Sequence, residues 1–124
     1  MPTLTIGEVS KAFPDGTRLV NAIEALGVDV GHRCGGRARC TTCRVTFEDG
    51  EPEAITEAEA EKLIEKGLFG EARLSCQIVL DRDMTVTPAM TLQSEGWSDT
   101  GPAPAETIEP DPTWTTRTEA AARD

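Results

Sequence analysis

Hydrophobic and polar residues alternate in several short stretches of the chain, with the period of two that is typical of half-buried strands. The stretch TLTI at residues 3–6 alternates in this way, and Gly7 and Glu8 behind it form a turn signal. A later stretch alternates so that Val45 and Phe47 share one face. The expected strands are residues 3–6, 9–13, 44–48 and 84–87.

Two other stretches repeat their apolar residues with the helical period of 3.6. The first predicts a helix over residues 18–26, with Thr17 as its N-cap and Gly27 as its end. The second, TEAEAEKLIEKG, predicts a helix that begins after Thr56 and ends at Gly67, with acidic residues in the first turn and lysines in the last. The order is β-β-α-loop-β-α-β, an α+β arrangement in which helices pack on a small mixed sheet.

From Pro88 onward the composition changes. This stretch holds five of the eight prolines, seven acidic residues and two basic ones, and it has almost no periodicity. We therefore expect a compact domain over residues 1–88 and an acidic, proline-rich extension over residues 89–124, which is disordered or draped over the domain. Trp97 and Trp114 are unusual in such a segment, and folding back onto the domain is the simplest explanation for them.

The formal net charge of −10 excludes several classes of partner. Nothing in the chain would offset the repulsion of nucleic-acid phosphates or of an anionic membrane surface, so a cationic patch on another protein is the natural complement. The first residues lack the pattern of a secretory signal, and no apolar run is long enough to cross a membrane. We expect a cytoplasmic protein, in which cysteines serve as ligands or reactive thiols rather than as disulfides.

Three of the four cysteines lie close together in HRCGGRARCTTCRV, residues 32–45, with the spacing C-x5-C-x2-C. The fourth stands 33 positions after the third. Two disulfides fit poorly with the expected compartment, and structural zinc usually uses two separated Cys-x2-Cys pairs, of which only one is present. The remaining possibility is an iron–sulfur cluster. The cysteines are Cys34, Cys40, Cys43 and Cys76.

The loop between the first two of these cysteines suits a cluster physically. Six extended residues would span roughly 20 Å, far more than neighbouring ligands require, so the segment must curl. Curling points backbone N–H groups at the anionic sulfurs, and hydrogen bonds to sulfur are one control on reduction potential. Gly35 and Gly36 allow the backbone to approach closely.

The spacing and its surroundings resemble the [2Fe-2S] ferredoxins. The first gap of five residues is similar to that of the adrenodoxin-like group, whereas plant-type members have four. The segment FPDGTRLVNAIEALGVDVGHRCGGRARCTTCRVTF resembles the helix and cluster loop of bacterial β-grasp ferredoxins, and RLSCQ resembles their fourth-ligand motif. The resemblance covers residues 3 to about 88.

This resemblance implies a ferredoxin-type β-grasp fold with the cluster-binding loop at one end of the sheet. It assigns one [2Fe-2S] cluster to Cys34, Cys40, Cys43 and Cys76, and it implies a one-electron carrier rather than an enzyme. The expected partners are a ferredoxin reductase and a terminal acceptor of the cytochrome P450, oxygenase or nitrogen-fixation type. The single histidine, His32, excludes a Rieske centre, which needs two, and is expected to make a structural contact.

Charged residues within the cluster loop and after it suggest two further roles. Arginines near the ligands either raise the reduction potential or lie screened in solvent; they are Arg33, Arg37, Arg39 and Arg44. The segment EDGEPEAITEAEAE, residues 48–61, holds seven carboxylates and no basic residue. It is either a solvated surface or, through Glu57, Glu59, Glu61 and their neighbours, a docking site for a cationic redox partner, as the family resemblance implies.

Two other functions remain open at this point. The chain could be an iron–sulfur assembly factor or a redox sensor, in which the cluster is transferred or sensed. The start of its loop, CGG, differs from the CEG that is typical of assembly-linked adrenodoxin-like ferredoxins, which favours the carrier. A zinc-stapled binding module is the third possibility.

Overall fold

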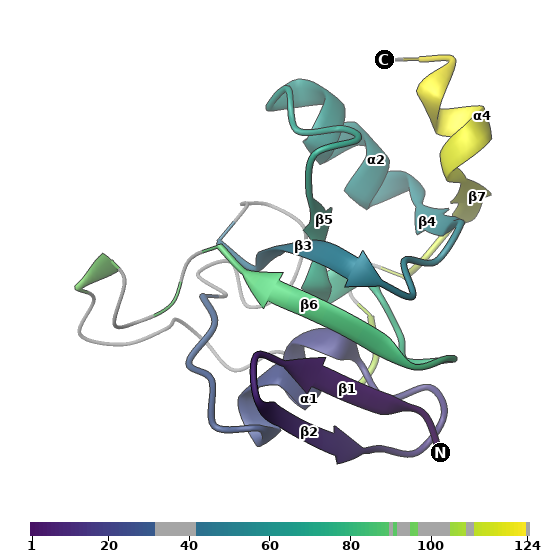
Figure 1. The fold of residues 1–124 in the computed structure, drawn as a ribbon. Helices are drawn as coiled ribbons and strands as arrows, with labels where there is room; N and C mark the ends of the chain where they lie inside the picture. Colours follow the sequence, from purple (N-terminus) through teal and green to yellow (C-terminus); the bar gives the residue numbers. More distant parts are fainter. Residues whose placement is uncertain (32–41, 90, 92–94, 97–104, 109–110, 124) are drawn as a thin grey trace.

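The structure is a computed structural model that describes residues 1–31, 42–89, 91, 95–96, 105–108 and 111–123. Its centre is a mixed five-stranded sheet with the order β2-β1-β6-β3-β5 (Figure 1). Strands β1 and β6 run parallel, and the other neighbours are antiparallel. The sheet elements are β1 (Thr3–Ile6), β2 (Val9–Ala12), β3 (Arg44–Asp49), β5 (Arg73–Leu74) and β6 (Met84–Pro88).

The remaining elements flank this sheet. Helix α1 lies against the sheet near β1 and β2, whereas α2 lies at the far end, beside β4 (Figure 1). A 3-10 turn, η1, follows β5 directly. These elements are α1 (Leu19–Ala25), β4 (Ala54–Thr56), α2 (Glu57–Glu65), η1 (Ser75–Gln77), β7 (Trp114–Thr116) and α4 (Arg117–Ala121).

The apolar faces predicted from the sequence form one core. Leu19 and Ile23 of α1 are fully buried with Leu4 of β1 and Val45 of β3. These side chains belong to a single cluster that also contains Leu63 of α2 and the two described cysteines. The predicted α+β arrangement, its four strands and its two helices are confirmed within one to two residues at each end.

The sequence predicted the N-cap of α2 correctly and the N-cap of α1 incorrectly. Thr56 caps α2 as expected, because its side chain accepts a hydrogen bond from the backbone N–H of Glu59 at 3.1 Å. The expected cap of α1 by Thr17 is wrong. The Thr17 hydroxyl donates to the carbonyl of Pro14 at 2.7 Å, and Arg18 occupies the cap position without a side-chain bond.

The turn after β3 requires glycine. Gly50 has a φ of +78°, and a Cβ atom at this position would lie 2.1 Å from the backbone oxygen of Asp83. The absence of a side chain therefore lets the end of β3 and the start of β6 come together. This turn was expected from the Asp49-Gly50 pair.

The extension contributes structure that the sequence did not predict. Strand β7 pairs antiparallel with β4, with Ala54 opposite Thr116 and Thr56 opposite Trp114. Helix α4 follows, and its Ala120 is fully buried. The Trp114 side chain remains 47% exposed and lines a pocket of about 220 Å³ with Pro52, Ala54 and Ile78. Trp97 lies outside the described residues.

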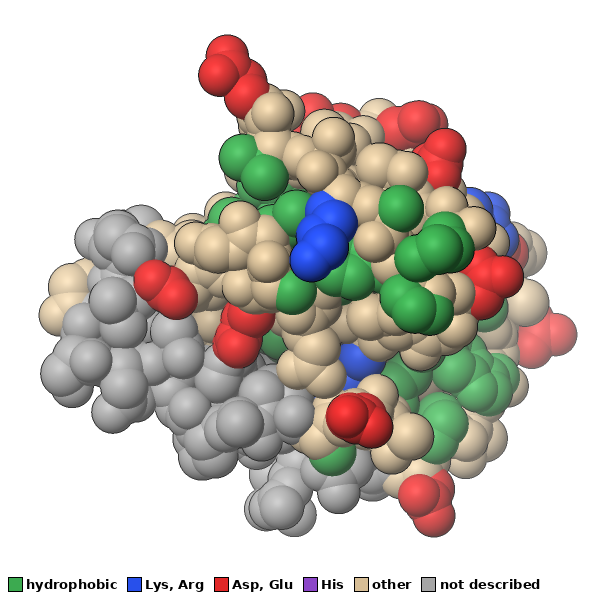
Figure 2. Space-filling view, turned by 90° about the horizontal axis from the view of Figure 1, so that it is seen from below, with side chains coloured by type: hydrophobic (Ala, Val, Ile, Leu, Met, Phe, Trp, Pro, Cys, Tyr) green, Lys and Arg blue, Asp and Glu red, His purple; other side chains and the backbone are tan. Residues whose placement is uncertain are grey.

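Acidic side chains are scattered over one face of the molecule. On the face shown in Figure 2 they lie both at the edge and further in, with hydrophobic and polar ones between them. Within the described residues, none of the helices is long and apolar enough to cross a membrane.

Candidate metal centre

The fold brings two of the four cysteines to the same end of the sheet. Cys43 directly precedes β3 and Cys76 follows β5, and these two strands pair with Arg44 opposite Leu74. The backbone N–H of Ser75 donates to the carbonyl of Cys43 at 3.2 Å, and the Ser75 hydroxyl donates to the same oxygen at 2.7 Å. Two cysteines that are far apart in the sequence are thus held side by side.

Both of these cysteines are shielded from solvent. Cys43 is 1% exposed and Cys76 is 0% exposed. The other two predicted ligands, Cys34 and Cys40, lie outside the described residues, as do His32 and the arginines of the cluster loop apart from Arg44, which is half-buried at the start of β3.

The surroundings of Cys76 supply polar groups to this buried part of the site. The side-chain amide nitrogen of Gln77 lies 3.6 Å from the sulfur of Cys76 and 3.5 Å from its carbonyl oxygen. An amide N–H directed at sulfur suits a thiolate, which is the form that binds iron. The donor chemistry and the burial therefore fit a cluster ligand at Cys76.

Arg18 is a buried residue of this site that the sequence did not single out. Its side chain is 1% exposed, and its Nε donates to the carbonyl of Cys76 at 2.7 Å. Its Nη1 donates to the carbonyl of Ala105, to which Asn21 also donates, both at 2.9 Å. Arg18 therefore connects the start of α1, the fourth cysteine and the extension. Its position at the edge of the apolar face of the predicted helix is the sequence feature that could have indicated its burial.

A second buried charge holds the strand that leads into Cys76. The Nε of Arg73 donates to Glu59 at 2.7 Å and its Nη2 to the same carboxylate at 3.2 Å, while the N–H of Leu74 donates to it at 2.8 Å. Burial raises the pKa of the Glu59 carboxyl, against the opposing effect of Arg73. Although desolvation disfavours its charge, the carboxylate of Glu59 keeps the pKa of Arg73 above its ordinary value. Glu59 is therefore a structural residue and not part of a docking surface.

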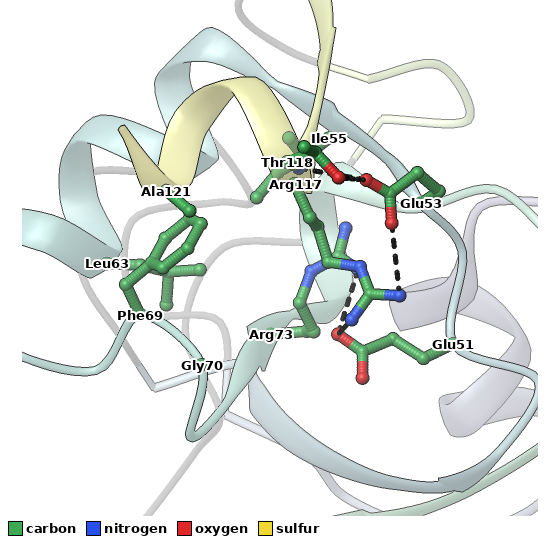
Figure 3. Close-up of a pocket in the computed structure, with 10 residues that line it drawn as sticks. All are labelled: Glu51, Glu53, Ile55, Leu63, Phe69, Gly70, Arg73, Arg117, Thr118 and Ala121. Carbon is green, nitrogen blue, oxygen red and sulfur yellow. Dashed lines mark hydrogen bonds and ion pairs between the residues drawn. The ribbon is translucent and has the colours of Figure 1, made fainter. Parts of the chain in front are cut away.

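The extension carries two basic residues, and both bind the acidic region of residues 48–61. Figure 3 shows Arg117 directed at Glu51 and Glu53, with ion-pair distances of 3.0 and 3.4 Å. Arg123 pairs with Glu57 at 2.7 Å. The contacts of Arg117 border a pocket of about 330 Å³ between α2 and α4, whose wall also includes Leu63 and Phe69.

Thr118 adds hydrogen bonds to this attachment. Its N–H and its hydroxyl donate to one oxygen of Glu53 at 2.9 and 2.8 Å, and they lower the pKa of that carboxyl. The backbone N–H of Glu57 donates to the carbonyl of Thr113, and that of Arg117 to the carbonyl of Glu53. We call residues 113–123 the C-terminal strap, because they pair with β4 and bind carboxylates before β4 and at the start of α2.

Comparison with known proteins agrees with this fold and site. The family model for the 2Fe-2S iron–sulfur cluster binding domain matches residues 4–81. The solved structure of the ISC-like [2Fe-2S] ferredoxin FdxB from Pseudomonas putida superposes with a TM-score of 0.55, at 25% identity, over 70% of this chain and 91% of that one. The fold is therefore the ferredoxin-type β-grasp, as the sequence predicted.

Two curated relatives extend the comparison. A 2Fe-2S ferredoxin from Pseudomonas aeruginosa is 36% identical over 97 residues, which are 73% of this chain and 86% of the relative. One component of the Na(+)-translocating NADH-quinone reductase of Idiomarina loihiensis is 34% identical over 57% of this chain, but the match spans only 17% of that much longer protein. The chain belongs to the [2Fe-2S] ferredoxin family, whose members carry electrons on a [2Fe-2S] cluster.

Proposed function

We propose that this chain carries single electrons between a reductase and a terminal acceptor protein, with one [2Fe-2S] cluster held by Cys34, Cys40, Cys43 and Cys76. The observation that supports the proposal best is the burial of Cys43 and Cys76 at one end of the sheet, inside the residues that match the family model. The cluster, when bound, accepts and returns one electron. We also propose that the protein works in the cytoplasm, as its cysteine usage suggests.

The chain itself contributes rigidity and shielding to this function. Ser75 fixes the backbone of Cys43, and Arg18 fixes that of Cys76, so both sulfurs stay in place when the charge of the site changes. Burial of the two sulfurs excludes water from this side of the site, and solvent exposure is one of the factors that set the potential.

The cofactor assignment is tested by purifying the protein without oxygen after growth with ample iron. We expect a coloured protein that contains two iron and two acid-labile sulfide atoms per chain, as the [2Fe-2S] stoichiometry requires. Dithionite should bleach the visible spectrum and produce an EPR signal from the mixed-valence state. A colourless protein that contains zinc in place of iron would disprove the proposal and support the zinc-stapled module.

The acidic region of residues 48–61 is the proposed docking site for the reductase or the acceptor. Fewer of its carboxylates can contact a partner than the sequence indicated, because Glu59 is buried. Glu51, Glu53 and Glu57 are exposed in part but are already paired with Arg117 or Arg123 of the C-terminal strap. The strap therefore weakens the field that a cationic partner would meet. The acceptor types that remain possible are cytochrome P450, oxygenase and nitrogen-fixation systems.

Neutralising the strap should strengthen docking. In the variant with Arg117→Gln and Arg123→Gln, we expect electron transfer to a basic cytochrome c to be about two- to fivefold faster at low salt, because steering acts on the association rate. The gain should vanish at high ionic strength. Stopped-flow kinetics over a series of salt concentrations measures both effects.

The matched control is Arg82→Gln. This change removes one charge from an exposed ion pair with Asp81, in which no carboxylate of the acidic region takes part. It should increase the electron-transfer rate much less than Arg117→Gln alone or Arg123→Gln alone. Equal gains from all three would mean that only net charge matters and that the acidic region is no specific docking site.

An assembly role is the second candidate, and one comparison favours it: the structure from Pseudomonas putida is described as ISC-like. Repeated reduction and reoxidation with the cluster retained would support the electron carrier. Transfer of the cluster to an apo-acceptor under mild conditions would support assembly.

A further inference from the structure

A buried chain of hydrogen bonds ends at the sulfur of Cys76. It starts at the N-terminus of α2, where the N–H of Glu59 donates to the hydroxyl oxygen of Thr56 at 3.1 Å. The Thr56 hydroxyl lies 2.8 Å from the side-chain oxygen of Gln77, and the side-chain nitrogen of Gln77 lies 3.6 Å from the sulfur of Cys76. All four residues have an exposed fraction of 0%.

The direction of these hydrogen bonds follows from the chemistry of the groups. The hydroxyl of Thr56 has one proton and two lone pairs: one lone pair accepts from the helix N-terminus, and the proton is donated to the side-chain oxygen of Gln77. Only the oxygen of an amide can accept that proton. The NH₂ group of Gln77 then faces Cys76, and a flipped amide would instead turn its oxygen toward the carbonyl oxygen and the sulfur of Cys76, which are both acceptors.

We propose that Thr56 and Gln77 tune the reduction potential by holding an amide N–H donor against the sulfur of Cys76. Gln77 is the tuning residue, and Thr56 is a positioning residue that fixes its orientation. Reduction adds negative charge to the cluster and its sulfur ligands, and a donor to sulfur stabilises the more negative state. The proposal rests on the assignment of Cys76 as a ligand.

The strongest feature of this arrangement is its isolation from solvent. A hydrogen bond in a buried, low-dielectric site is electrostatically stronger than one in water. The amide of Gln77 is anchored to the first turn of α2 and not to a mobile surface group, so the donor is already in place before the electron arrives.

Two variants remove the donor in different ways. Gln77→Leu deletes the amide, and Thr56→Val deletes the proton that orients it while leaving the side-chain shape almost unchanged. We expect each to lower the equilibrium constant for reduction about fivefold, roughly 40 mV at 59 mV per tenfold for one electron. The midpoint potential is measured by a spectroelectrochemical titration of the loaded protein, with iron content and the visible spectrum recorded in parallel.

The controls separate tuning from a loss of structure. Thr56→Ser keeps both the cap and the proton and should retain the wild-type potential. Thr116→Val removes the equivalent cap of α4, where the Thr116 hydroxyl accepts from the N–H of Glu119, but has no link to Cys76. It should leave the potential unchanged. Should Gln77→Leu lose its cluster, the comparison of Thr56→Val with Thr56→Ser still decides.

Unchanged potentials in both Gln77→Leu and Thr56→Val, with the cluster intact, would overturn the proposal. An equal shift in Thr116→Val would do the same, because it would point to a general effect of lost caps. A failure of the ligand assignment gives a different result: Cys76→Ser would then retain the wild-type spectrum and iron content.

Discussion

Replacing Cys76 by serine is expected to abolish stable binding of the cluster. The site loses a buried sulfur on a residue whose backbone Arg18 holds in place, and the smaller, harder oxygen of serine is a poor substitute for a thiolate as a ligand to iron. Losing a residue that merely supports a metal ligand typically costs 10- to 100-fold in affinity, so losing the ligand should cost at least about 100-fold. Iron per chain after gel filtration, and the rate of iron loss to a chelator, measure the change.

Ser75→Ala is the matched control for this experiment. Ser75 is the neighbour of Cys76 in the sequence. The change removes the 2.7 Å hydrogen bond from its hydroxyl to the Cys43 carbonyl but keeps all four cysteines. We expect it to bind a cluster with the wild-type spectrum and to lose iron only moderately faster. If Cys76→Ser held its iron as well as Ser75→Ala does, the fourth ligand would have to be sought elsewhere.

The second large effect is expected from Arg73→Met. The change leaves the fully buried carboxylate of Glu59 without its main counter-charge. It also removes the hydrogen bonds that Arg73 donates to the carbonyls of Pro52 and Ala54. Breaking one side of a buried pair usually costs about 3–5 kcal/mol. Urea unfolding of the loaded protein, followed by tryptophan fluorescence, gives the free energy of unfolding.

The pH dependence of this loss has a definite sign. Burial already raises the pKa of Glu59 in the folded protein above its ordinary value of 4.5, and removal of Arg73 should raise it further. Folding then favours the protonated carboxyl, so the variant is least destabilised below pH 4.5 and loses stability as the pH rises through the raised pKa. A loss that stayed constant over this range would show that the charge of Glu59 is not the cause.

Two further variants define the reason for the loss. Arg82→Met breaks an exposed pair with Asp81 and should change the free energy of unfolding by no more than about 0.5 kcal/mol. The double variant Glu59→Leu with Arg73→Met removes both buried charges and should recover much of the stability, since apolar replacements of buried pairs are often neutral.

The sequence predicted those features that local patterns determine. The alternation of TLTI identified β1, and the acidic first turn after Thr56 identified α2 with its cap. The cysteine spacing indicated a loop and one distant ligand, and the structure places Cys43 just before β3 and Cys76 in the turn η1 that follows β5, the strand paired with β3. The two remaining positions, Cys34 and Cys40, stay a prediction.

Features that depend on distant pairs were not predictable in this way. Strand β7 has three residues in a proline-rich segment, and only its pairing with β4 makes it a strand. The buried carboxylate of Glu59 looked like one more acid on a solvated helix face, because its partner Arg73 lies 14 residues away and has no local relation to it. The cap predicted for α1 was wrong because the Thr17 hydroxyl bonds to a carbonyl in the turn before it, and Arg18 takes the cap position.

The pairing of β4 with β7 also has a consequence for the order in which the chain folds. Ala54 meets Thr116, 62 positions later, whereas the strands of the central sheet draw on residues no further along than Pro88. On a ribosome, the sheet can close before Trp114 has emerged, and the extension then docks onto a preformed surface. A protein fused behind residue 124 would therefore be tethered near the start of α2, beside the acidic region that we propose as the docking site.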